Sequence, residues 1–246
     1  MVLSMGKLAS KELMPGSDLD LILIYDAPQD ETTSDGAKPL AVSAYYSRLC
    51  QRLVNALTAL TAEGRLYEID LRLRPSGNKG PLACSLIGFD SYHRKESWTW
   101  EHMALTRARP VAGDPDLCQT VKDVIEHVLK LPRDQSKLLR DVYSMRQKMA
   151  NELDKGSPWD LKQARGGIVD GEFMVQYLLL REAHAADVLG RVTLAASIQA
   201  LHRAGALETT AASSLTEALA FWQSLQAVLR VTVVGDFKPH EASSGM

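Results

Sequence analysis

A short apolar run entered through two aspartates places the strongest constraint on how this chain can fold. Residues 16–20 (GSDLD) lead directly into residues 21–24, which are Leu, Ile, Leu and Ile. A brief run of this kind that soon meets turn-forming residues is typical of a buried strand, because helices need longer amphipathic patterns. Side chains alternate between the two faces of a strand. If the strand begins at Asp18, then Asp18 and Asp20 point to the same side.

The paired carboxylates of Asp18 and Asp20 allow two interpretations. Carboxylates held close together repel one another unless a cation or a proton lies between them. Mg²⁺ takes oxygen ligands of this kind and is usually completed by the phosphates of a substrate. The other interpretation is a surface pair at the entrance of a strand, since short motifs of this kind recur by chance.

Two further segments carry polar residues that suit a phosphate ligand. Residues 6–13 (GKLASKEL) are predicted to form a turn into a short helix, where backbone N–H groups and the Ser10 hydroxyl can hold a phosphate. Residues 67–75 (YEIDLRLRP) alternate apolar and charged side chains and are predicted to form a strand with Asp70 and Arg72 on its charged face. Arg72 either holds a nucleotide phosphate or pairs with Asp70, as on an edge strand with a salt-bridged outer face.

Helical periodicity dominates the rest of the chain. Residues 42–60 form one long amphipathic pattern, whose apolar side is expected to pack on the core. Asp114 and Pro115 suit the N-cap and the first position of a helix, and no clear strand pattern follows them. About five helices are predicted from there on, as a bundle. We therefore place one domain at residues 1–112 and a helical bundle at residues 113–246.

Three smaller features have both a structural and a functional interpretation. The indole of Trp98 is expected in the core, and the imidazole of His102 is expected to be a hydrogen-bonded structural group rather than a ligand. In residues 160–173, two glycines precede an acidic helix start. Simple capping, with Asp170 as the cap and Glu172 favoured by the helix dipole, is one explanation. The alternative is a loop of the second domain that closes on the site of the first.

The composition limits the partners and the compartment. The 246 residues include 28 basic and 30 acidic side chains, so the net charge of −2 predicts no general attraction to nucleic acid or a membrane surface. The three cysteines are widely spaced, which argues against a zinc site or a disulfide framework and for a reducing compartment. No apolar run is long enough to cross a bilayer, and no signal peptide is visible. We expect a cytoplasmic protein.

Several runs, in a fixed order, resemble the glutamine synthetase adenylyltransferases, which are bifunctional adenylylating and deadenylylating enzymes of the nucleotidyltransferase superfamily. The runs are GKLASKEL, GSDLDLILIYD, LYEIDLRLRPSGNKGPL, SWTWEHMALTRARPVAGD and GGIVDGEFMVQYLLL. The resemblance extends from about residue 2 to about residue 231. It implies an α+β fold, in which a nucleotidyltransferase-type mixed sheet with flanking helices is followed by an all-α bundle. WTWEH and YEIDLRLRPSG are more similar to the C-terminal, adenylylating half of such enzymes.

The resemblance also implies roles for particular residues, with ATP as substrate and Mg²⁺, in two ions, as cofactor. Catalytic and metal-binding carboxylates fall on Asp18, Asp20 and Asp70. Nucleotide-binding positions fall on Gly6, Lys7, Ser10, Ser17, Arg72 and Arg74. The sequence departs from the family at two places: Ala9 and Ser10 stand where two glycines are usual, and Gly171 replaces an apolar residue.

The activity implied by the resemblance is transfer of AMP to a tyrosine hydroxyl of glutamine synthetase, with release of pyrophosphate. Asp70 is the best candidate for the base. A PII signalling protein is the implied regulator of the full-length enzyme, and no nucleic-acid or membrane partner is expected. Two alternatives stay open: a deadenylylating half that phosphorolyses adenylyl-tyrosine to ADP, and a non-catalytic regulatory module with the same fold.

Overall fold

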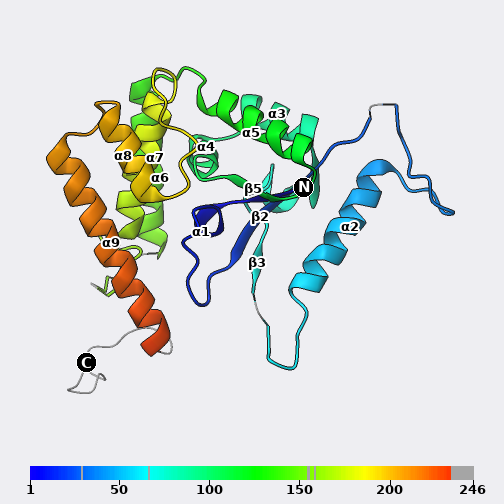
Figure 1. The fold of residues 1–246 in the computed structure, drawn as a ribbon, viewed down its shortest axis with the longest axis horizontal. Helices are drawn as coiled ribbons and strands as arrows, with labels where there is room; N and C mark the ends of the chain where they lie inside the picture. Colours follow the sequence, from blue (N-terminus) through cyan, green and yellow to red (C-terminus); the bar gives the residue numbers. More distant parts are fainter. Residues whose placement is uncertain (29, 66, 154–155, 158, 234–246) are drawn as a thin grey trace.

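A mixed sheet built around one central strand forms the middle of the molecule. The computed structural model describes residues 1–28, 30–65, 67–153, 156–157 and 159–233 (Figure 1). The central strand is β2 (Leu19–Tyr25), which pairs antiparallel with β1 on one edge and parallel with β3 and β4 on the other. β1 also pairs antiparallel with β5. The other strands are β1 (Val2–Ser4), β3 (Ile69–Asp70), β4 (Ala83–Ser85) and β5 (Arg109–Ala112).

Burial of β2 explains why its sequence is so apolar. The four residues at positions 21–24 are each at most 4% exposed, so both faces of the strand are covered. Leu3 of β1 and Ile22 of β2 join one hydrophobic cluster with Phe89 of α3 and Met103 of α4. These helices are α3 (Leu86–Lys95) and α4 (Thr99–Leu105). The prediction of a buried strand and of an α+β mixed-sheet fold is confirmed.

The strand predicted over residues 67–75 is wrong in its length, because β3 comprises only Ile69–Asp70. One oxygen of the Asp70 carboxylate accepts a hydrogen bond of 2.8 Å from the backbone N–H of Arg72, two residues further on. An aspartate that bonds the backbone in this way starts a turn instead of continuing a strand. The alternating letters beyond Asp70 therefore belong to a turn, which continues into a 3₁₀ helix at Gly77–Lys79.

The long amphipathic helix is present as α2 (Val42–Leu57), but its predicted packing on the core is wrong. No residue of α2 is buried, and Leu49 and Leu53 are 50% and 36% exposed. Figure 1 shows the reason: α2 lies beside the sheet at the edge of the molecule, away from the other helices. Apolar side chains of α2 such as Leu49 and Leu53 are therefore exposed to solvent, with no described residue burying them.

Five helices follow residue 113 in the described part of the chain, as the sequence predicts. Asp114 caps the first of them by accepting hydrogen bonds of 3.0 Å from the N–H groups of Asp116 and Leu117, and Pro115 occupies the first helical position. The helices are α5 (Pro115–Leu129), α6 (Gln135–Leu153), α7 (Ile168–Glu182), α8 (Leu194–Arg203) and α9 (Thr209–Thr232). None of the described helices is long and apolar enough to span a membrane.

Helix α7 contacts α6, α8 and α9, and α9 packs closely against it. A second hydrophobic cluster joins α7, α8 and α9. At Gly171 of α7 the two helices come so near that a Cβ atom would lie 2.6 Å from Cδ2 of Leu219 in α9. The glycine that departs from the family pattern therefore permits this close approach. The first hydrophobic cluster includes residues from both sides of position 112, and the division into two domains there stays a prediction.

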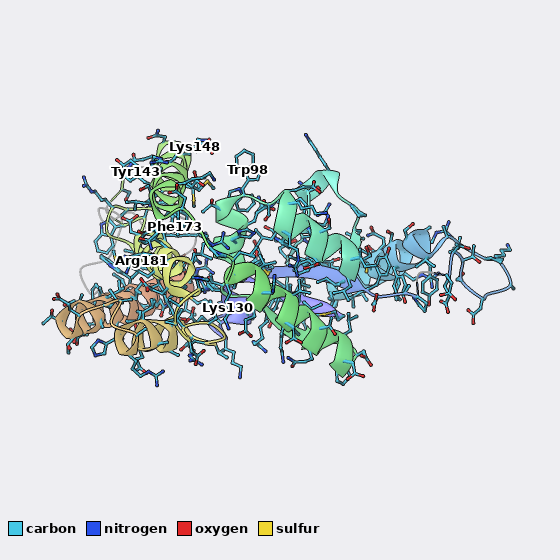
Figure 2. The ribbon with its side chains drawn as sticks, turned by 90° about the horizontal axis from the view of Figure 1, so that it is seen from above. Trp98, Lys130, Tyr143, Lys148, Phe173 and Arg181 are labelled. Carbon is cyan, nitrogen blue, oxygen red and sulfur yellow. The ribbon has the colours of Figure 1, made fainter. Side chains whose placement is uncertain are left out.

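The side chain of Trp98 lies on the surface and not in the core. Seen from above in Figure 2, Trp98 points out of the molecule at the start of α4. Its exposed fraction of 71% means that the expected burial of this indole in the core is wrong. Trp98 is the N-cap residue of α4 and lies at the turn between α3 and α4, where the chain runs over the surface.

Candidate functional site

The predicted carboxylates come together at the start of β2. In the parallel pair β2–β3, Asp20 is directly opposite Asp70. The turn at Gly6 reaches the same point, because a Cβ atom on Gly6 would lie 2.6 Å from Oδ2 of Asp20. Gly6 has a φ of +52°, in the left-handed region that favours glycine. Three segments predicted separately from the sequence therefore meet at one place.

The charges of the three aspartates influence one another. The pKa of Asp20 is raised, first by burial and then by the negative charges of Asp70 and Asp18. The pKa of Asp70 is lowered, because the guanidinium of Arg72 donates hydrogen bonds to both of its carboxylate oxygens. Asp18 is exposed just before β2 begins. Asp20 is thus the more basic of the two paired carboxylates.

Whether these residues suit a metal ion depends on Arg72. The side chains offer only carboxylate oxygens, which are the ligands that Mg²⁺ prefers. Burial raises the pKa of Asp20, and the negative charges of Asp70 and Asp18 raise it further; a bound cation would relieve this repulsion. Within the described ranges, however, no three acidic, histidine or cysteine side chains are arranged to hold a metal ion. Both oxygens of Asp70 are bonded to Arg72 instead. The donor set fits Mg²⁺ in its chemistry, with Asp18 and Asp20 available and Asp70 engaged.

The turn around α1 (Gly6–Ala9) supplies Lys7 and Ser10, and the two side chains face different surroundings. The Nζ atom of Lys7 donates a 2.8 Å hydrogen bond to Oε1 of Gln226 in α9. Ser10 is only 1% exposed. Its hydroxyl donates to the carbonyl of Gly6 at 3.2 Å and accepts from Nε of Arg107 at 2.8 Å. The Lys7 side chain therefore reaches α9, whereas the buried Ser10 side chain supports the turn.

The remaining predicted residues lie around the same site. Asp18, Asp70, Arg72 and Arg74 all line an open hollow of about 560 Å³. Arg74 braces the turn after β3, since its Nη1 donates to the carbonyl of Leu71 at 2.7 Å. The hydroxyl of Ser17, just before the aspartates, accepts hydrogen bonds from the N–H of Met14 at 3.1 Å and from Nη1 of Arg230 at 3.3 Å.

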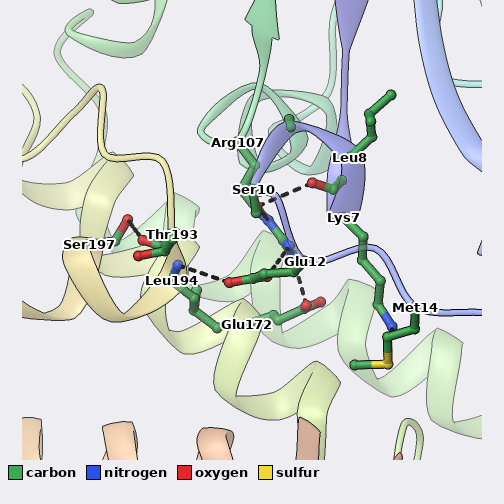
Figure 3. Close-up of polar contacts among 12 residues, drawn as sticks. Lys7, Leu8, Ser10, Glu12, Met14, Arg107, Glu172, Thr193, Leu194 and Ser197 are labelled. Carbon is green, nitrogen blue, oxygen red and sulfur yellow. Dashed lines mark hydrogen bonds and ion pairs between the residues drawn. The ribbon is translucent and has the colours of Figure 1, made fainter. Parts of the chain in front are cut away.

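An arginine that the sequence did not single out connects this site with the helical region (Figure 3). Arg107 donates to Oε2 of Glu12 at 3.0 Å and to Oε1 of Glu172 at 2.8 Å, in addition to Ser10. The other oxygen of Glu12 accepts a 3.3 Å hydrogen bond from the N–H of Leu194 at the start of α8. The side chains of Arg107, Glu12 and Glu172 are 10%, 17% and 17% exposed, so the cluster is largely shielded from water.

The start of α7 is not capped as the sequence suggested, and it contacts the first region. Gly167, and not Asp170, is the N-cap residue, so the predicted cap is wrong. Asp170 lies in the first turn, where it accepts a 2.6 Å hydrogen bond from the N–H of Gly166 and pairs with Arg146. Glu172 contacts Arg107 of the sheet-containing part. The segment therefore both stabilises a helix end and joins the second region to the first.

His102 is a structural histidine, as expected. Its Nδ1 lies 2.9 Å from Nη1 of Arg133, and its Nε2 lies 2.9 Å from the carbonyl oxygen of His93. Because an arginine can only donate, Nδ1 is the acceptor and Nε2 carries the proton. Burial lowers the pKa of His102 to about 4 and that of His93 to about 3. Both imidazoles are thus held neutral.

Comparison with known proteins assigns this arrangement a family. Residues 1–124 match the family model described as glutamate-ammonia ligase adenylyltransferase, and residues 125–234 match the one described as GlnD PII-uridylyltransferase. A bifunctional glutamine synthetase adenylyltransferase/adenylyl-removing enzyme of Xanthobacter autotrophicus is 48% identical over the whole chain, which covers 25% of that relative. An enzyme of the same name from Brucella suis is 56% identical over 73% of the chain, which covers 18% of that relative. The chain spans about a quarter of the length of the curated relatives that it matches over its whole length.

Proposed function

The chain belongs to the glutamate-ammonia ligase adenylyltransferase family, and from this premise we propose that it transfers AMP from ATP to a tyrosine hydroxyl of glutamine synthetase, with release of pyrophosphate. One observation carries the proposal. Asp20 lies opposite Asp70 and against Gly6, so the carboxylates lie beside the turn that we predict to bind phosphate. This combination suits a nucleotide whose phosphates must be held beside acidic groups.

Residues of the first region would contact the phosphates of ATP or support the turns that do so. Gly6 allows the turn to approach the phosphates, and Lys7 and Arg72 supply positive charge to them. Ser10, Ser17 and Arg74 would keep the surrounding turns in place. Mg²⁺, held by Asp18 and Asp20 and by Asp70 once Arg72 releases it, would neutralise phosphate charge and favour in-line displacement at the α-phosphorus.

The proton of the attacking tyrosine needs an acceptor among these carboxylates. Asp70 is the base suggested by the resemblance, but its hydrogen bonds to Arg72 lower its pKa. Asp20 has a raised pKa and accepts a proton more readily in the arrangement described. Release of Arg72 to the nucleotide phosphates would make Asp70 more basic, so ATP binding itself would prepare Asp70 for this role.

A labelling experiment tests the proposal. With α-labelled ATP and glutamine synthetase, the chain should transfer label to the synthetase and release pyrophosphate. Asp18→Asn and Asp20→Asn should each abolish the transfer, whereas Asp35→Asn, in an exposed loop, should leave it unchanged. Undiminished labelling by both of the first two variants would refute the role of these carboxylates.

A second assay separates the two halves of the family. We propose the adenylylating half, on the strength of the WTWEH and YEIDLRLRPSG runs. Production of ADP from phosphate and adenylylated synthetase would instead identify the deadenylylating half. Location in the cytoplasm and regulation of the whole enzyme by a PII protein are part of the same proposal.

A further inference from the structure

The C-terminal part of α9 reaches both segments that surround the candidate site. Gln226 and Arg230 are four residues apart and therefore lie on the same face of the helix. Gln226 accepts a 2.8 Å hydrogen bond from Lys7, on one side of the site. Arg230 donates through Nη1 to the carbonyl of Pro15 at 3.0 Å and to the hydroxyl of Ser17 at 3.3 Å, next to the aspartates. One helix face thus spans the turn and the loop.

Like charges are gathered at this contact. Lys7 lies near the positive charges of Arg230, Lys162 and Arg107, while the negative charge of Glu172 acts in the opposite direction on Lys7. After burial, the charge of Arg230 is the largest cause of the lowered pKa of Lys7. Positive side chains brought together in a partly buried place repel one another, and an anion between them removes that repulsion. The hydrogen bonds of Arg230 to Pro15 and Ser17 use only Nη1, and they would be made as well by a neutral donor.

We propose that Arg230 is a nucleotide-binding residue, which together with Lys7 contacts the phosphate chain of a nucleoside triphosphate, and that Gln226 positions Lys7 for this contact. The ligand class is a polyphosphate. The inference rests on the proposed function, since it adds residues of α9 to the nucleotide site formed by the turn at Gly6 and the aspartates of β2 and β3. The helical region would then take part in binding the nucleotide instead of only presenting the protein substrate.

A purely structural role of Arg230 makes a different prediction. If Arg230 only fastens α9 to the loop at Pro15 and Ser17, its replacement removes that contact but takes no charge away from a ligand. Loss of the charge would then have little effect on any ligand. If Arg230 contacts phosphates, loss of the charge weakens every ligand that carries them, including inorganic pyrophosphate, which has no adenosine to hold it.

Calorimetry on the complete 246-residue chain can distinguish these roles. We would titrate a non-hydrolysable ATP analogue and pyrophosphate, each with Mg²⁺, into the unmodified chain, Arg230→Gln and Arg230→Lys. Arg203→Gln, at an exposed arginine that ends α8, is the matched control. Arg230→Gln should weaken both ligands about 10- to 100-fold, the range for a lost hydrogen bond to a charged group. Arg230→Lys should recover part of the affinity, and Arg203→Gln should change neither ligand.

The outcomes separate this inference from the function on which it rests. Undiminished binding of both ligands by Arg230→Gln would overturn the role of Arg230 and leave the proposed function intact. Weakened ATP-analogue binding with unchanged pyrophosphate binding would also overturn it, because the effect would then not involve phosphates. If the unmodified chain binds neither ligand, the proposed function itself fails. Equal thermal midpoints of all the variants would show that folding is unaffected.

Discussion

Replacement of Arg107 by methionine should destabilise the protein strongly, although Arg107 lies outside the predicted site. The change keeps much of the side-chain volume but removes the cation that pairs with both Glu12 and Glu172. Breaking a buried ion pair by removing one partner costs about 3–5 kcal/mol. The carboxylates retain some contact with water, because each side chain is 17% exposed, so we expect a loss of about 3 kcal/mol.

Urea denaturation with a double-mutant cycle measures this cost and identifies its cause. A loss of about 3 kcal/mol corresponds to a fall of roughly 6–12 °C in thermal midpoint for a chain of this size. Arg94→Met is the matched control, because Arg94 pairs with Asp90 on one helix and the two side chains are 35% and 32% exposed. Such a surface pair contributes less than about 1 kcal/mol.

The second arm of the cycle uses Glu172→Gln, alone and combined with Arg107→Met. If repulsion between Glu12 and Glu172 causes the damage, neutralising one of them should recover part of the loss in the double variant. The reasoning is refuted if Arg107→Met costs no more than Arg94→Met. It is also refuted if the two single effects simply add, because the residues would then not be coupled.

Two other predictions concern the turn and the buried histidines. Gly6→Ala should abolish ATP binding, because its Cβ would lie 2.6 Å from the Asp20 carboxylate, whereas Gly16→Ala, with a φ of +69° and open space around it, should retain binding in the same calorimetric assay. Equal effects of the two would show that backbone strain alone is responsible. Because the pKa of His93 falls to about 3 on folding, the unfolded chain binds more protons, and stability is lost as the pH falls from about 6.5 towards 3. His93→Phe should therefore remove about 2 kcal/mol of the loss measured by urea unfolding between pH 7.5 and pH 5, and an unchanged loss would contradict the assignment.

Local patterns in the sequence predict those parts of the fold that local physics decides. The run after Asp20 is buried because both faces of β2 are covered, and the Asp114–Pro115 pair starts a helix because it supplies a cap and a fixed φ. The convergence of Asp20 and Asp70 was likewise implied by the order of the motifs in the resembling family. Its geometry, a parallel register opposite Gly6, became visible only in the structure.

Contacts that alternation and periodicity do not reveal decide the parts that the sequence did not predict. Alternation after Asp70 resembles a strand, but the Asp70 carboxylate accepts a hydrogen bond from the backbone N–H of Arg72, and the chain turns there. An amphipathic pattern shows that α2 has an apolar face, yet it does not show whether this chain covers that face. Arg107 joins residues 95 positions before it and 65 positions after it, and no periodic signal links such distant places.

Because α7 and α9 approach closely at Gly171, the size of the residue at this position controls the angle between the two helices. Arg230 lies 11 residues beyond Leu219, which faces this glycine, so the distance along the helix is about 16 Å at 1.5 Å per residue. If a larger side chain at position 171 tilted α9 by about 5°, the far end would swing by roughly 1.4 Å, which is enough to break a hydrogen bond of ordinary length. If Arg230 contacts the nucleotide as proposed, a larger residue at position 171 would therefore weaken nucleotide binding without changing any residue that touches the nucleotide.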